Sequence, residues 1–304
     1  MFIKQIYKTL GMISIVITAF NEPGIKKAID AVLEQESKEK YELIISAPDK
    51  ETENIVKSYN DKRVKYFKDK GRGKANAINE IFKIVKGEIL ILSDGDVFLD
   101  KNAVSEILKL FEDKNVGCVS GRPVALNSKK HMIGYWSNLL LDAGAHRIRK
   151  EMDGKGKFLE CSGYLFAFRN LIKKIPTDVA EDSIIPYLIW KKGYRIRYAE
   201  NARVFVKYPD NLKDFIKQRK RAGAGSHSRL TKYDKNFPKV KSFWNEARKG
   251  IFWAFGYAEN LKELIWSFCL IFVRAWIWIG YYLDAARGKG YVDKWERVES
   301  TKAI

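Results

Sequence analysis

Two aspartates separated by one glycine are the residues of this chain best suited to chemistry. Four consecutive apolar residues, 89–92, are followed by Ser93 and then by Asp94, Gly95 and Asp96, a pattern that predicts a strand buried on both faces of a sheet. Ligands bind at the carboxyl ends of such strands in open α/β sheets. Two carboxylates this close repel each other unless a cation lies beside them, and Mg²⁺ or Mn²⁺ bridges carboxylates to substrate phosphates. The pattern therefore predicts a metal-diphosphate site, with an ordinary Asp-Gly turn as the alternative.

A second acidic pair, Glu181 and Asp182, precedes an apolar stretch that predicts a helix over residues 183–192. Acids at a helix N-terminus are stabilised by the helix dipole, which is one explanation for the pair. A carboxylate in this position could also serve as the general base that takes a proton from an acceptor hydroxyl.

Basic residues are placed where a phosphate would need them. A glycine-rich loop before a predicted helix holds Arg72 and Lys74 and could bring backbone N–H groups to a phosphate. Its spacing half matches a dinucleotide fingerprint, but Asn76 replaces the third glycine and the loop follows the third strand, which disfavours a nicotinamide-binding enzyme. Gln218 and Arg221 lie one helical turn apart, and we expect the glycine-rich stretch after them to be a mobile loop that closes over an anion.

The elements that must position these residues alternate between strands and helices. Apolar and β-branched runs predict strands at 12–19, 42–47, 64–67, 89–92, 116–120 and 194–206, with a strand pair over 158–169. Apolar residues at helical spacing predict helices from residue 25 and over 51–59, 74–85, 103–111 and 131–150. This alternation predicts an α/β fold with a largely parallel central sheet and helices on both faces.

The composition is that of a basic globular protein. Lys and Arg number 56 against 37 Asp and Glu, a formal net charge of +19, so the expected partners are phosphorylated ligands, polyanions or an anionic membrane surface. Three cysteines without metal-type spacing disfavour a disulfide framework or a zinc site. The N-terminal residues lack the continuous apolar core of a signal peptide. We expect a protein of a reducing compartment.

The C-terminal region differs from the rest of the chain. Residues 264–283 are apolar and aromatic with Arg274 as their only charge. Their length would permit a membrane span, but an arginine at the centre is unfavourable there, and basic residues flank both sides. We expect helices lying in the cytoplasmic interface of an anionic membrane, a buried core or dimer helix being the alternative. The predicted regions are a catalytic domain, 1–230, and a basic, aromatic helical region, 231–304.

Taken together, these motifs resemble those of the family-2 glycosyltransferases, which have the GT-A fold, and in particular the membrane-associated branch that includes polysaccharide synthases. The six matching motifs occur in the family's order. They are ITAFNE at 17–22, like the nucleotide-binding first-strand motif; 71–79, like G-x-G-x-A-x-N; 94–96, like the metal-binding D-x-D; Ser162-Gly163, like the acceptor-side S-G; Glu181-Asp182, like E-D; and 218–221, like Q-x-x-R-W.

The resemblance implies an inverting, metal-dependent transfer of a sugar from a nucleotide-diphosphate donor, UDP favoured over GDP, to a hydroxyl or phosphate of a lipid-linked or glycan acceptor. It implies Asp182 as general base, with Glu181 and Arg221 as further catalytic residues. Mg²⁺ or Mn²⁺ would be held by Asp94 and Asp96, with His227 as a candidate third ligand. The implied donor-binding residues are Thr18, Ala19, Phe20, Glu22, Asp49, Arg72, Lys74, Asn76, Asp94, Gly163 and Gln218.

Two departures from the family pattern qualify this picture. Ala47-Pro48-Asp49 stands where the family often has an Asp pair that contacts the base, so we expect Asp49 to substitute. Ala222 replaces the tryptophan of Q-x-x-R-W, which stacks on the acceptor sugar in processive synthases, and this favours transfer of one or a few sugars.

Two other classes stay open. A sugar-phosphate nucleotidylyltransferase has a similar sheet but would need a G-x-G-T-R loop where this chain has Phe20-Asn21-Glu22. A non-enzymatic basic protein that binds a membrane or nucleic acid would explain the charge. Such a protein would not explain the carboxylates at the strand ends, so we expect no nucleic-acid partner. From the basic, aromatic C-terminal region we expect a location at the cytoplasmic face of the cell membrane.

Overall fold

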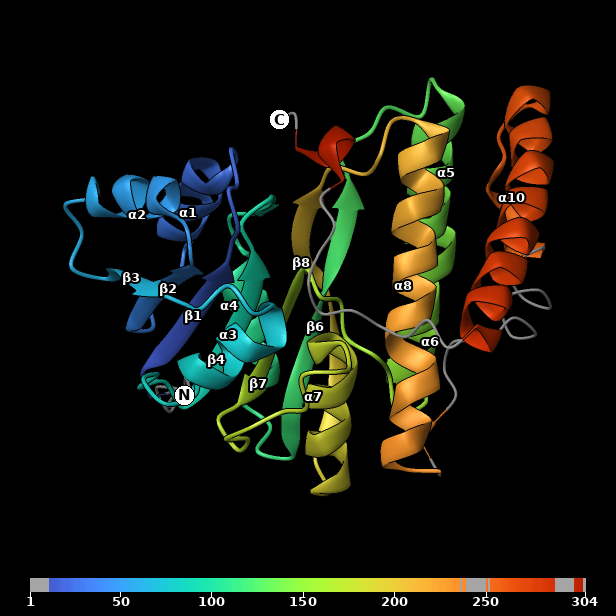
Figure 1. Ribbon diagram of the computed structural model, residues 1–304. Coiled ribbons are helices and arrows are strands. Elements are labelled where there is room, and N and C mark those ends of the chain that lie inside the picture. Colours follow the sequence, from blue (N-terminus) through green and yellow to red (C-terminus); the bar gives the residue numbers. More distant parts are fainter. Residues whose placement is uncertain (1–10, 236, 239–249, 251, 288–297, 303–304) are drawn as a thin grey trace, which may run out of the picture.

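The β-branched and apolar runs of the chain form one central sheet with helices around it (Figure 1). The computed structural model describes residues 11–235, 237–238, 250, 252–287 and 298–302, without the side chains of 221–229, 231–232, 281, 284–286 and 299. The sheet has eight strands in the order β3-β2-β1-β4-β7-β6-β8-β5. Their bounds are β1 Ile13–Thr18, β2 Tyr41–Ala47, β3 Val64–Lys68, β4 Ile89–Asp94, β5 Val97–Leu99, β6 Val116–Ala125, β7 Leu165–Arg169 and β8 Arg195–Val206.

The helices follow the strands in the alternation that the sequence predicts. They are α1 Ile25–Leu33, α2 Lys50–Lys57, α3 Lys74–Ile81, α4 Ala103–Leu110, α5 Met132–Leu139, the π-helix η1 Leu140–His146, α6 Arg147–Gly154, α7 Glu181–Lys191, α8 Leu212–Tyr233, α10 Leu261–Ala286 and the 3₁₀ turn η2 Glu299–Thr301. The predicted α/β class is confirmed.

The sheet is parallel in its first half and mixed in its second. Strands β1, β2, β3 and β4 pair in parallel, as do β6 and β8. Strand β7 runs antiparallel between β4 and β6, and β5 pairs antiparallel with β8. Parallel neighbours end at the same edge of a sheet, so the carboxyl ends of β1, β2 and β4 meet at one edge.

Alternating side chains send each strand's apolar residues to both faces. On one face, Ile15 of β1 and Ile91 of β4 pack with Ile29 of α1 and Ile107 of α4. On the other face, other residues of β1, β2 and β4 pack with α3 and α7. A sheet covered in this way holds its strand ends rigidly, which a site built at those ends requires.

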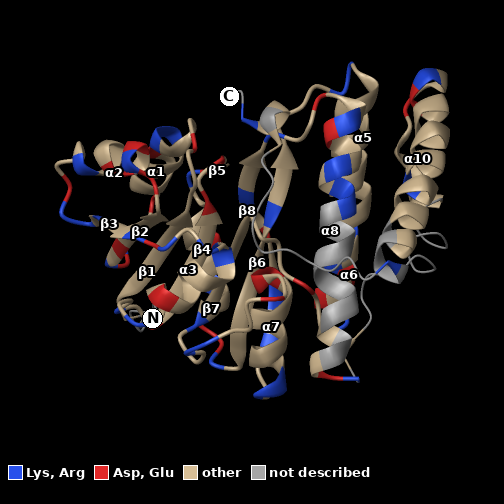
Figure 2. Ribbon diagram, viewed as in Figure 1, with Lys and Arg blue, Asp and Glu red and all other residues tan. Residues whose placement is uncertain are grey.

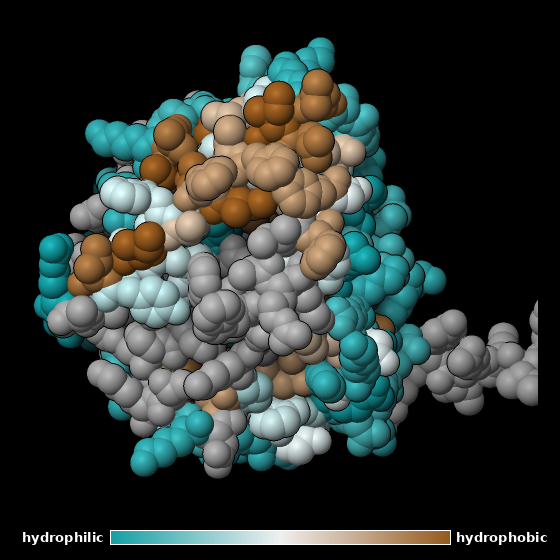
Figure 3. Space-filling view, turned by 90° about the vertical axis from the view of Figure 1, so that its right-hand side faces the viewer, coloured by the Kyte–Doolittle hydropathy of each residue, from teal (hydrophilic) through white to brown (hydrophobic). Residues whose placement is uncertain are grey.

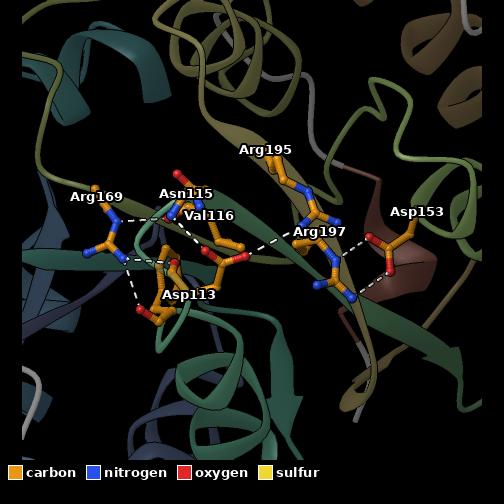
Figure 4. A network of polar contacts seen from close by, with 8 residues as sticks. Asp113, Asn115, Val116, Asp153, Arg169, Arg195 and Arg197 are labelled. Carbon is orange, nitrogen blue, oxygen red and sulfur yellow. Dashed lines mark hydrogen bonds and ion pairs between the residues drawn. The ribbon is translucent and has the colours of Figure 1, made fainter. Parts of the chain in front are cut away.

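An arginine network ties the sheet together at the edge opposite the ends of β1 and β4 (Figure 4). Nε of Arg169, at the end of β7, donates to the carbonyl oxygen of Val116, at the start of β6, at 2.8 Å. The same guanidinium donates to the Asp113 carbonyl oxygen at 3.3 Å, and the Asp113 carboxylate pairs with Arg195 of β8 at 3.5 Å. These contacts fix three strands whose other ends reach the candidate site.

A third apolar cluster joins the C-terminal helices to the body of the protein. Trp136 of α5 lies 5.5 Å, ring to ring, from Phe215 of α8, and its indole Nε1 donates to the carbonyl oxygen of Trp266 in α10 at 2.6 Å. The Tyr135 and Ser267 hydroxyls are 2.8 Å apart between α5 and α10. Helices α5, α8 and α10 thus stand side by side (Figure 1). The predicted boundary at residue 230 falls inside α8.

The structure corrects several predictions of secondary structure. The glycine-rich stretch 222–225 is not a loop, because α8 runs through it from Leu212 to Tyr233; Phe215 anchors this helix, and packing outweighs the roughly 1 kcal/mol cost of each helical glycine. Only β7 of the expected strand pair over 158–169 is a strand, with an isolated bridge from Ser162 to Leu165. The three-residue β5 is too short to show periodicity, and the helix predicted for 131–150 is divided by the π-helix η1.

Candidate active site

The ends of β1 and β4 place Thr18 beside Asp94. The two residues are register partners in parallel strands, and the Thr18 hydroxyl donates to Oδ1 of Asp94 at 3.2 Å. The Asp94 side chain is buried, with 6% of the residue exposed. A carboxylate removed from water in this way needs a cation nearby.

Gly95 allows the chain to turn directly after Asp94. Its N–H donates to the carbonyl oxygen of Thr18 at 3.0 Å. A Cβ atom added to Gly95 would lie 2.9 Å from the Ala19 Cβ and 3.2 Å from Cδ1 of Ile25, which is too close for any larger residue. The glycine between the two aspartates is therefore required by packing.

Lys74 is the cation that neutralises the buried acids. It starts α3, after Gly73, whose φ of 104° suits glycine. Its ammonium lies 2.6 Å from Oδ1 of Asp94 and 2.7 Å from Oε1 of Glu181, and it donates to the Gly163 carbonyl oxygen at 3.3 Å. The family resemblance implies that Lys74 binds the donor; in the structure its ammonium lies between two carboxylates.

The pKa shifts follow from this burial. Burial raises the pKa of Asp94 above its ordinary value, although the Lys74 ammonium opposes the shift. For Lys74, burial disfavours the ammonium, but Asp94 and Glu181 outweigh it and raise the pKa. The lysine is therefore charged at neutral pH, and it links β4, α3 and α7 through one atom.

Asp182 lies against the Ser162-Gly163 turn. It follows Glu181 in the first turn of α7, and a Cβ atom added to Gly163 would lie 3.2 Å from its Oδ2. The N–H of Cys161 donates to its carbonyl oxygen at 3.2 Å. The two acidic motifs, far apart in sequence, are thus brought together through Gly163 and Lys74.

Asp96 faces a second cluster, with Glu22 and Lys302. The Lys302 ammonium lies 2.7 Å from Oδ2 of Asp96 and also pairs with the Glu22 carboxylate. Burial raises the pKa of Glu22; Lys302 lowers it and Asp96 adds to the rise. No sequence signal marks Lys302, because no motif surrounds it and it contacts residues more than 200 positions away.

Asp49 holds two loops at the same edge. Its Oδ2 accepts from the N–H of Asn21 at 3.0 Å, and its Oδ1 accepts from the N–H of Thr52 at 2.8 Å as the N-cap of α2. Burial raises its pKa, but these N–H groups outweigh burial and lower it overall. Phe20 beside this loop is 62% exposed, so its ring is open to a ligand.

The remaining basic loop is partly structural. The Asn76 side-chain amide donates to the carbonyl oxygen of Arg72 at 2.9 Å, which fixes the loop, and Arg72 itself is exposed. Asn79, the last residue of the 71–79 motif, exchanges two hydrogen bonds with the backbone of Ile175. Of this loop, the exposed Arg72 side chain is open to a donor phosphate.

Helix α8 borders the site with basic and aromatic residues. The Arg219 guanidinium lies 4.8 Å from the centre of the Tyr208 ring, and the Tyr208 and Tyr164 rings are 6.2 Å apart. Gln218 is buried, and its Oε1 has no hydrogen-bond partner among the described residues. Neither Tyr164 nor Arg219 is predicted as a site residue from the sequence, although Arg219 lies within the Q-x-x-R motif.

Two predicted residues cannot be placed in the site. The side chains of Arg221 and His227 lie outside the described part of the structure, although both residues belong to α8. Within the described residues, no three His, Cys, Asp or Glu side chains group as ligands of one metal ion. A Mg²⁺ or Mn²⁺ ion at Asp96 would thus need phosphate or water oxygens to complete its shell, as Mg²⁺ ordinarily does.

Comparison with known proteins identifies the family. The model of glycosyl transferase family 2 matches residues 14–175, more than half of the chain, and the chain belongs to this family. Its mixed α/β fold is accordingly of the GT-A type.

Among its relatives are synthases of one polysaccharide. The poly-β-1,6-N-acetyl-D-glucosamine synthase of Staphylococcus epidermidis is 24% identical over 282 residues, covering 88% of this chain and 66% of that protein. The synthase of a second S. epidermidis strain is 25% identical over 254 residues (80% and 59%), and that of Staphylococcus aureus is 26% identical over 178 residues (57% and 43%). The chain therefore spans no more than 66% of the length of these relatives.

Proposed function

We propose that this glycosyltransferase is metal-dependent and inverting, and that it moves a sugar from a nucleotide-diphosphate donor to a hydroxyl or phosphate of a lipid-linked or glycan acceptor. The observation that carries the proposal is the meeting of the Asp94-Gly95-Asp96 turn and the Glu181-Asp182 pair at one edge of the sheet. One acidic turn would face the diphosphate, and the other would face the acceptor.

The residue roles follow from their positions. Asp182 takes the proton of the acceptor hydroxyl, whose oxygen forms a bond to the anomeric carbon. The bond from that carbon to the diphosphate breaks on the opposite face, and its electron pair leaves with the nucleotide. Asp96 would hold Mg²⁺ or Mn²⁺, which supplies positive charge to the departing diphosphate. Arg72 and Arg219 of α8 would add to that charge, and Figure 2 shows Lys and Arg on the upper, described part of this helix.

The names of the relatives indicate which donor sugar to test first. Their product is a β-1,6-linked polymer of N-acetylglucosamine, so a UDP-linked N-acetylhexosamine is the first donor to test. Ala222, in place of the family's tryptophan, favours a product of one or a few sugars. Mass spectrometry of the products formed on a short β-1,6-glucosamine primer distinguishes this from a long polymer.

We also propose that α10 brings the enzyme to a membrane surface. Its segment Leu261–Gly280 is apolar and long enough to span a bilayer, and 17% of that window is buried. One side docks on α5 and α8, while the other carries an exposed apolar stripe of Ile265, Phe268, Phe272, Trp276, Ile279 and Leu283. Figure 3 shows a group of brown, hydrophobic side chains on one face of the molecule. An exposed apolar face of this kind is typical of interfacial helices.

Vesicle flotation tests the membrane proposal. Wild-type protein should float with vesicles that contain anionic lipid, and the Phe272→Glu/Trp276→Glu variant should remain at the bottom, because it places charges at the centre of the stripe. Wild-type protein that does not float with any vesicle would contradict the proposal.

Thermal shift and product analysis test the reaction. The melting temperature should rise with UDP and Mn²⁺ together more than with either alone, and GDP and CDP should act less. Release of a nucleoside diphosphate from the sugar donor supports the glycosyltransferase, whereas pyrophosphate release from a nucleoside triphosphate and a sugar phosphate would indicate a nucleotidylyltransferase. Binding without any turnover would favour a non-enzymatic protein.

A further inference from the structure

The last described residues of the chain fold back into the candidate active site. Val298 and Thr301 are each 6% exposed, so this short segment is packed against the protein. The Ser300 hydroxyl donates to Oδ2 of Asp214, at the start of α8, at 2.6 Å, and the Ser300 N–H donates to the same oxygen at 3.4 Å. Ser300 therefore anchors the segment two residues before Lys302.

Lys302 occupies the space between two acids of different motifs. Its ammonium is 2.7 Å from Oδ2 of Asp96 and also pairs with Glu22. The side chain of Lys302 is 17% exposed, that of Asp96 22% and that of Glu22 4%. Glu22 comes from the loop after β1 and Asp96 from the turn after β4. The family resemblance implies that Glu22 binds the nucleotide and that Asp96 binds the metal ion, and no sequence pattern predicts that the two carboxylates share one cation.

We propose that Glu22 and Asp96 form a single cation site that Lys302 and a divalent metal ion occupy in turn, so that metal binding releases residues 298–302 from the site. The proposal rests on the proposed function in taking Asp96 as a metal ligand. Its new content is the pairing of Glu22 with Asp96 and the exchange with Lys302.

The chemistry of the site favours an exchange. A Mg²⁺ ion binds carboxylate oxygens at about 2.0–2.1 Å, and an ammonium already within hydrogen-bond distance of the same oxygen blocks that approach. Two cations at one place also repel each other strongly at low solvent exposure. Once Lys302 leaves, a divalent ion and the donor diphosphate can share the space that the ammonium held.

The exchange makes a measurable prediction about metal affinity. Binding of the ion must displace the ammonium, so the intact segment weakens metal binding. Lys302→Met removes the competing charge and should tighten Mn²⁺ binding about tenfold, the scale of one hydrogen bond to a charged group. Ser300→Ala keeps the lysine but removes the hydroxyl that anchors it to Asp214, so it should tighten binding by a smaller factor.

Mn²⁺ titration of the full chain without nucleotide tests this directly, with free Mn²⁺ followed by electron paramagnetic resonance. The matched control is Lys62→Met, which removes an exposed lysine between α2 and β3 and should leave the affinity unchanged. Hydrogen exchange supplies a second readout, because Mn²⁺ should speed exchange in the peptide containing 298–302 of the wild type. Equal affinity in wild type and Lys302→Met, or unchanged exchange with Mn²⁺ bound, would overturn the proposal, as would an absence of Mn²⁺ binding in both proteins.

A parallel assay of donor turnover separates this proposal from the proposed function. If wild-type protein releases UDP from a UDP-sugar and Asp182→Asn does not, the proposed function stands whatever the Mn²⁺ titration shows. If the titration is as predicted but no donor is turned over, the cation site stands and the reaction must be assigned again.

Discussion

Replacing Lys74 by methionine should destabilise the protein strongly, although the two side chains are similar in length. The Lys74 ammonium contacts Asp94 at 2.6 Å, Glu181 at 2.7 Å and the Gly163 carbonyl oxygen at 3.3 Å. The lysine and both acids are nearly buried, with side-chain exposures of 5%, 8% and 6% in that order. The substitution therefore leaves two buried carboxylates without their cation.

Removing one partner of a buried ion pair costs about 3–5 kcal/mol of folding free energy. For a chain of this size, that loss corresponds to a fall in melting temperature of roughly 6–20 °C. The loss of folding free energy should depend on pH. Burial raises the pKa of Asp94 and Lys74 opposes that rise, so without Lys74 the folded-state pKa lies further above the unfolded value. Such a carboxyl destabilises the fold most at high pH, and its protonation on acidification removes the penalty.

The assay is urea unfolding of wild type and Lys74→Met at pH 7.5 and pH 5.5. We expect the stability difference to shrink at the lower pH. The double variant Lys74→Met/Glu181→Gln should recover part of the loss, because one of the two unpaired carboxylates is then neutral, with a coupling free energy of about 0.5–3 kcal/mol. A difference below about 1 kcal/mol that is the same at both pH values would refute the buried ion-pair network.

Three further predictions follow from other parts of the structure. Asp182→Asn should lower the rate of sugar transfer by about 10²–10⁴-fold with little change in melting temperature. A variant that loses activity because it no longer folds would show that Asp182 has a structural role. Gly95→Ala should cost about 1–3 kcal/mol in chemical unfolding, because the added Cβ would lie 2.9 Å from that of Ala19. Burial raises the pKa of Glu42, but Lys65 and neighbouring donors outweigh it and lower the pKa overall. Its contribution to stability is thus present above its ordinary pKa and lost as pH falls through the lowered value, so Glu42→Gln should reduce the acid dependence of the melting temperature, whereas the exposed Glu36→Gln should not.

The sequence predicted the first half of the fold well because that half is built from local periodicity. Strands β1 to β4 are short apolar runs between helices whose apolar residues recur at helical spacing, and each signal lies within about ten residues. The position of Asp94 at a strand end followed directly from that pattern. Its closeness to Asp182 followed only from the family resemblance, since more than 80 residues separate them.

What the sequence did not reveal depends on contacts between distant residues. Lys302 has no local pattern, and its role arises from ion pairs with Glu22 and Asp96 across more than 200 positions. The sequence places Lys74 in a basic, glycine-rich loop, but no local pattern predicts that its ammonium is buried between Asp94 and Glu181. The glycine-rich part of α8 was expected to be a loop, yet packing of Phe215 on Trp136 fixes the helix that contains it.

The most direct test of the central claim is UDP release from a UDP-N-acetylhexosamine in the presence of Mn²⁺, compared between wild type and Asp96→Asn. Asp96→Asn keeps the shape of the side chain but removes the charge that would hold the metal ion. We predict Mn²⁺-dependent release by the wild type and a fall of about 100-fold or more in the variant. UDP release by Asp96→Asn at the wild-type rate, or release that does not depend on a divalent ion, would contradict the account.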